Sequence, residues 1–147
     1  MLKSLMKKIL WLIIIAALIL VFYRIFSNQP AEPAAPTPII VPLAAMSDSG
    51  ESGEAIFEEV DGQVRVMVEL VGAPRDVSQP AHLHKGSCGA PGEQIYTLSS
   101  VSNGASETIL TVSLAAIADN LPLALNVHKS AAEINVYVAC GEVMNED

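Results

Sequence analysis

The stretch EAIFEEVDGQVRVMVEL, residues 54–70, indicates the fold class of the chain. In its second half, apolar residues at every second position alternate with Arg65, Met67 and Glu69. This period of two is typical of a strand with one buried face. The pair Asp61-Gly62 stands before it and favours a tight hairpin turn. The stretch therefore predicts two antiparallel strands that meet at Asp61-Gly62.

Further short segments after this hairpin also have the character of strands. Ser102-Asn103-Gly104 predicts another turn, and the alanine-rich segment 114–120 predicts one or two helical turns before Pro122. Short strands with turn signals at this spacing indicate an all-β domain, either a sandwich or a barrel. The additional strands are expected over residues 80–85, 93–99, 108–114, 123–128 and 134–140.

The N-terminal residues 1–27 have the composition of a membrane anchor. Three lysines precede an uncharged apolar run over 9–23, and with its flanking residues the helix reaches roughly 20 residues, enough to span a bilayer. A cleaved signal peptide has the same basic start, but no small-x-small site follows this run directly. We expect an uncleaved transmembrane helix, with its lysines in the cytoplasm and the rest of the chain outside, at the cell surface or in the periplasm.

Residues 28–52 are expected to form an extended linker. They contain five prolines among alanines, followed by a serine- and glycine-rich segment. Ile39, Ile40 and Val41 have the apolar character of a strand, but the flanking prolines argue against one. The folded domain is therefore expected over 53–147. That domain carries 13 acidic and 4 basic residues, so we expect no nucleic-acid partner.

The three histidines of the chain lie in two short segments that suggest a metal site. On a strand, His82 and His84 project from the same face, and His128 joins them if its strand lies alongside. Three imidazoles with an open position suit copper or zinc. Because no carboxylate or thiolate stands near them in the sequence, copper is favoured. The alternative is that the histidines pack and hydrogen-bond in a β core without a metal.

The two cysteines, Cys88 and Cys140, follow the two histidine segments. Outside the cytoplasm two cysteines are expected to form a disulfide, which here closes a loop of 52 positions. Such a bond stabilises the fold by about 4 kcal/mol in the chain-entropy account. The alternative is that the two thiolates bind copper.

Three segments together resemble the copper/zinc superoxide dismutase family. They are 81–84 with Gly86 and Cys88 after it, 126–129 around His128, and the Ala-Cys-Gly segment 138–143 around Cys140. The resemblance implies a Greek-key β-sandwich of seven or eight strands. It further implies copper held by His82, His84 and His128, a Cys88–Cys140 disulfide, and dismutation of superoxide to oxygen and hydrogen peroxide.

The chain also departs from that family. No histidine lies between His84 and His128, so the family's fourth copper histidine and its zinc loop have no counterpart, and a zinc site is not expected. Tyr137 stands where the family has an arginine that guides superoxide. Lys85 and Lys129, each directly after a histidine, offer local positive charge or are simply solvated.

Three functions therefore remain open from the sequence. The first is a superoxide dismutase-like enzyme, and the second is a copper-binding or copper-handling domain without turnover. The third is a metal-free structural or interaction module, because the domains found in chordin also contain segments like Ala81-His82-Leu83-His84. The oligomeric state does not follow from the sequence.

Overall fold

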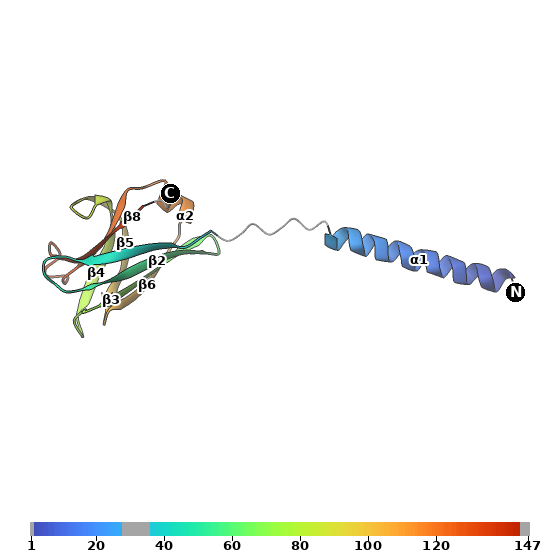
Figure 1. Cartoon of the computed structure of the whole chain (residues 1–147), viewed down its shortest axis with the longest axis horizontal. Helices are drawn as coiled ribbons and strands as arrows, with labels where there is room; N and C mark the ends of the chain where they lie inside the picture. The colour runs from blue at the N-terminus through green and yellow to red at the C-terminus, as the bar shows by residue number, and fades with distance from the viewer. Residues whose placement is uncertain (1, 28–35, 145–147) are drawn as a thin grey trace. The chain divides into compact units, whose positions relative to one another are not determined.

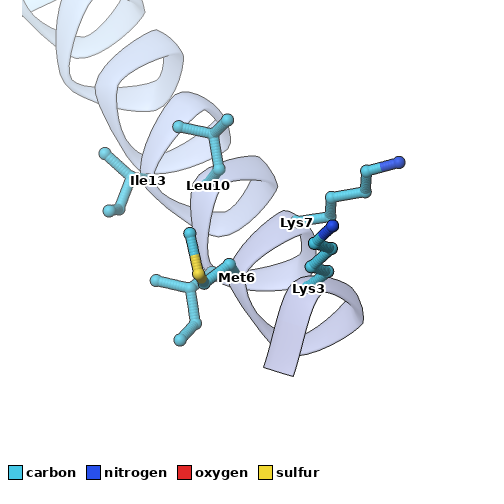
Figure 2. Close-up of a pocket in the computed structure, with 6 residues that line it drawn as sticks. Lys3, Met6, Lys7, Leu10 and Ile13 are labelled. Carbon is cyan, nitrogen blue, oxygen red and sulfur yellow. The ribbon is translucent and has the colours of Figure 1, made fainter. Parts of the chain in front are cut away.

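The computed structural model describes residues 2–27 and 36–144. They fall into two units, an N-terminal helix and a β domain, which are described separately (Figure 1). The helix α1 spans Leu2–Ser27, and it is long and apolar enough to cross a membrane. Figure 2 shows the amines of Lys3 and Lys7 on one side of α1 and Met6 and Ile13 on the other; all four line one surface pocket of the helix.

The second unit is one closed barrel of eight antiparallel strands, so the expected all-β class and strand number are confirmed (Figure 1). The order around the barrel is β1-β2-β3-β6-β5-β4-β7-β8, and β1 pairs with β8 to close it. The separation into two sheets that a sandwich requires stays a prediction. The elements are β1 Ile39–Ala45, β2 Ser52–Val60, β3 Gln63–Val71, β4 Ser78–Ser87, β5 Ala90–Ser102, β6 Ala105–Leu110, α2 Leu114–Ala118, β7 Leu123–His128 and β8 Tyr137–Val143.

The hairpin expected at Asp61-Gly62 is confirmed. Val60 pairs with Gln63 across it, and both turn residues have positive φ, 53° and 73°, as a two-residue hairpin turn requires. The alternating apolar side chains of β3 point into the barrel and are buried, whereas Arg65, Met67 and Glu69 face outward. The local sequence pattern alone therefore specifies β2 and β3.

The barrel interior is filled by apolar side chains from all eight strands. The strands contribute mainly valine and leucine, the residues that suit a pleated buried surface. The helix α2 adds Leu114 and Ile117, and Ser113 caps its first turn by accepting a hydrogen bond from the Ala116 amide. The largest fully buried side chains are Phe57, Leu83, Ile117, Leu123 and Leu125.

The expectation that residues 39–41 do not form a strand is wrong. They begin β1, which pairs with β2 from Ile39 to Leu43 and with β8 only at Ala44 and Ala45. Pro42 therefore pairs with β2 alone. A proline, which has no amide hydrogen, is tolerated at such a position because it resembles the edge of a sheet. Residues 28–35 of the expected linker lie outside the described residues.

Some strand ends also differ from the expected ones. β4 and β5 are longer than predicted, and their pairing contains three register shifts. β6 ends at Leu110, before the predicted 114, and β8 begins at Tyr137 rather than 134. Residues 130–136 instead form a tight return loop, in which Glu133 and Val136 donate to the Ser130 and Glu133 carbonyls. This loop matters for the histidines because it follows His128 directly.

Gly141 marks the closest approach between β8 and β1. A Cβ at this position would lie 2.4 Å from the Pro42 carbonyl oxygen and 2.6 Å from a methyl group of Val41. We expect Gly141→Ala to destabilise the domain by about 1–3 kcal/mol, because the two strands must move apart. Urea unfolding followed by far-UV circular dichroism measures this. Gly89→Ala is the control, since its Cβ meets no atom within 4 Å; equal midpoints for the two variants would contradict the expectation.

Candidate metal centre

The three histidines converge on one face of the β4–β7 pair, as expected. The register between these strands is unbroken and places His82 opposite Asn126 and His84 opposite Ala124, so His82, His84 and His128 share a face. Their ring centroids lie 4.7–6.1 Å apart. One nitrogen from each ring lies within 4.8 Å of the other two. This is a set of donors that can surround a single ion.

Two backbone carbonyls define the tautomers of His84 and His128. The Nδ1 of His84 lies 3.1 Å from the Gly92 carbonyl oxygen, and the Nδ1 of His128 contacts the Ile134 carbonyl oxygen. A carbonyl only accepts, so each Nδ1 must carry the proton and donate it. Each Nε2 is then left with a free lone pair, which is the form of imidazole that binds a metal.

The remaining contacts point to a common position for the ion. The Nδ1 of His82 lies 2.9 Å from the Nε2 of His128 and donates to it, because that Nε2 holds a lone pair. The Nε2 of His84 is buried and makes no hydrogen bond within the described residues. A buried nitrogen without a partner carries a free-energy cost that a metal ion would remove. The donor set therefore fits a metal held by His82 Nδ1, His84 Nε2 and His128 Nε2, once His82 carries its proton on Nε2 instead of Nδ1 and the hydrogen bond to His128 is replaced by the ion.

Burial favours the neutral forms of His82 and His128, and the neutral form of imidazole is the one that binds a metal. Desolvation lowers the pKa of His82 from its ordinary value of 6.5, and repulsion from the His128 and His84 rings lowers this pKa further. Desolvation also lowers the pKa of His128, although its hydrogen bond to the Ile134 carbonyl opposes the shift. At neutral pH both rings therefore offer lone pairs.

These lowered pKa values predict how the stability of the metal-free chain depends on pH. Below about pH 6.5 the two histidines bind fewer protons in the folded state than in the unfolded state. Their contribution to the free energy of unfolding is therefore complete above this pH and is lost as the pH falls below it. We expect a lower urea midpoint at about pH 5.5 than at about pH 7.5. In His82→Ala with His128→Ala this difference should shrink. A urea midpoint that is higher at the lower pH than at the higher pH would contradict this prediction.

The disulfide joins the β4–β5 turn to β8, the strand next to β7. Cys88 and Cys140 are bonded, with their Cα atoms 5.9 Å apart, so the expected pairing is confirmed and the thiolate alternative is excluded. Cys88 lies between β4 and β5, and Cys140 in β8 pairs with Asn126 of β7. The bond therefore ties the hairpin that contains the Gly92 carbonyl to the strand next to β7.

The two lysines beside the histidines are engaged elsewhere. The Lys85 amine donates to the Asn120 carbonyl at 2.5 Å, and the Lys129 amine forms an ion pair with Glu133 at 2.7 Å. The charge of Lys129 is thus partly compensated, whereas Lys85 keeps its charge and is held at the Asn120 carbonyl. Tyr137, in contrast, contacts the site: its ring centroid lies 4.9 Å from that of His128.

Sequence reasoning did not find the groups that orient the rings. Gly92 and Ile134 act through their carbonyl oxygens, which every residue has, so no residue type marks them. Tyr137 was noted only as a departure from a family pattern. Its position in the last strand, opposite His128 in the pairing of β7 with β8, is the signal that places it at the site.

Comparison with known proteins agrees with the fold. No family model matches the chain, and no curated protein matches it in sequence. A solved structure of a point mutant of Candida albicans superoxide dismutase 5 is similar, with a TM-score of 0.58 and 17% sequence identity over 77% of this chain and 94% of that one. At this identity the likeness shows the fold, and it confirms at that level the resemblance noted in the sequence. The chain thus combines a superoxide dismutase-like β-barrel with a cluster of three histidines.

Proposed function

We propose that this chain is a membrane-anchored protein that binds copper outside the cytoplasm and dismutates superoxide to oxygen and hydrogen peroxide. The observation that carries the proposal is the convergence of three imidazole nitrogens, one of them buried and without a hydrogen-bond partner among residues 2–27 and 36–144. The superoxide dismutase-like fold supports the reaction class. The apolar helix α1 supports the anchor, and the disulfide supports an oxidising compartment.

Copper is proposed because the donors are all imidazoles. Imidazole serves both copper and zinc, whereas hard ions such as magnesium prefer oxygen. A bound copper ion would supply a one-electron redox couple. The residues of the chain do the rest: the Gly92 and Ile134 carbonyls orient the rings of His84 and His128, and burial keeps His82 and His128 deprotonated at neutral pH. We propose no zinc site, since the chain has no fourth histidine.

Three imidazoles leave at least one position of a four-coordinate ion open for a small ligand. The approach of an anion to it is not favoured by the net charge of the folded domain, which is acidic, and the neighbouring Lys129 is paired with Glu133. Electrostatic steering raises association rates by about 10- to 1000-fold where it operates. We therefore expect dismutation well below the diffusion limit, at a rate that does not fall when the ionic strength is raised.

The test is the decay of superoxide followed after pulse radiolysis, with the full chain in detergent and loaded with copper. The expected result is catalytic decay that is lost in the His82→Ala, His128→Ala double variant. If the wild-type chain binds copper but shows no more decay than this variant, dismutation is refuted.

A copper-binding role without turnover is the second candidate. The acidic domain favours it, because its negative charge attracts a copper ion but repels superoxide, and Lys129 is paired with Glu133. Copper binding with a stoichiometry near one but without superoxide decay is the result that would select it. Binding of no copper at all would instead leave the metal-free structural module.

A further inference from the structure

The return loop after His128 places an aromatic ring on the metal site. Residues 130–136 turn tightly, and Lys129 donates its amide to the Val136 carbonyl at 2.8 Å, so that Tyr137 comes back opposite His128. A register shift lies between Val127 and His128 in the pairing of β7 with β8. Such irregularities redirect side chains near functional sites. The loop thus positions two groups on His128, the Ile134 carbonyl and the ring of Tyr137.

The Tyr137 ring contacts two of the three histidines. Its centroid lies 4.9 Å from that of His128, with the planes inclined by 52°, and 6.5 Å from that of His84 in an edge-on arrangement. Both distances fall in the range of favourable aromatic pairs. His128 is 3% exposed and His84 is 9% exposed, whereas Tyr137 is only half-buried. The tyrosine ring therefore covers part of the solvent side of these two imidazoles.

We propose that Tyr137 controls access to the histidine cluster and holds the His128 ring in place. In this role it admits ligands of two or three atoms and hinders larger chelating molecules. The inference rests on the proposed copper site and adds to it the residue that selects the ligand. Selection is by size rather than by charge, because the Tyr137 side chain is an uncharged ring, the Lys85 amine is held at the Asn120 carbonyl and Lys129 is paired with Glu133.

The test compares how fast copper leaves the full chain in detergent when excess EDTA is added. We expect copper removal to be about tenfold faster from Tyr137→Ala than from wild type. This factor corresponds to losing the free energy of one strong contact between two aromatic rings. Tyr137→Phe keeps the ring and should match wild type. Azide titration of the copper(II) form, followed by its absorption and electron paramagnetic resonance spectra, should give similar affinities in wild type and Tyr137→Phe. The spectrum of Tyr137→Ala should change, since His128 loses its packing partner.

Equal removal rates for wild type and Tyr137→Ala would overturn the proposal. So would a Tyr137→Phe variant as fast as Tyr137→Ala, because the hydroxyl group would then be responsible. If Tyr137→Ala fails to fold, as judged by circular dichroism, Tyr137→Leu replaces it: this variant keeps apolar volume but not the flat ring, and it should also release copper faster. Superoxide decay of the wild-type chain tests the proposed enzyme separately, so either idea can fail alone.

Discussion

Replacing both His82 and His128 by alanine is expected to abolish copper binding. The Nδ1 of His82 and the Nε2 of His128 lie 2.9 Å apart, and the three histidines each offer a nitrogen within 4.8 Å of the other two. Without the pair, a single imidazole remains, which cannot surround the ion. Titration of the full chain in detergent with copper(II), against a competing dye, should give about one equivalent for wild type and near zero for the double variant.

The controls for this experiment separate the loss of ligands from the loss of fold. Lys85→Ala changes a residue next to His84 whose side chain points away from the ligands, and it should keep the wild-type stoichiometry. Circular dichroism of the double variant should match wild type, because the imidazoles lie on the outer face of β4 and β7 and not in the barrel core. A wild-type stoichiometry near zero, or one unchanged in the double variant, would refute the metal site.

The sequence predicts those parts of the fold that depend on local pattern. The β2–β3 hairpin follows from alternation and from Asp61-Gly62, and β7 occupies the predicted range 123–128. β1 could not be predicted from the sequence. A strand tolerates Pro42 only if no neighbouring strand needs a hydrogen bond from its nitrogen, and the neighbours of β1 are determined by its pairing with β2 and β8. Closure joins residues almost a hundred positions apart, which no local pattern encodes.

The candidate site shows the same division. The residue types were evident from the sequence, and the period of a strand places His82 and His84 on one face. Their approach to His128 required the pairing of β4 with β7, which are not consecutive strands. The orientation of the rings required the Gly92 and Ile134 carbonyls, which come from two separate loops or hairpins. The ligands could thus be predicted, but not the groups that fix their tautomers.

Breaking the disulfide is expected to have the largest effect on stability. The Cys88–Cys140 bond closes a loop of 52 positions, so its loss should lower the free energy of unfolding by about 4 kcal/mol. Cys88→Ser is the preferred variant, because it leaves the buried Cys140 in place as a small thiol. The urea midpoint of the metal-free chain measures the effect, and Ser87→Ala, one residue away, is the control.

The same change is expected to weaken copper binding. The bond anchors residues 88–92, and the Gly92 carbonyl at the end of this segment accepts the hydrogen bond from His84 Nδ1 that leaves the Nε2 lone pair free. With the anchor removed, His84 loses part of its orientation, and loss of such an outer contact typically reduces metal affinity by about 10- to 100-fold. The competitive copper titration should therefore show weaker binding with the stoichiometry retained. If Cys88→Ser lowers the urea midpoint but binds copper as tightly as wild type, then His84 is oriented without the help of the disulfide, and the bond serves the fold alone.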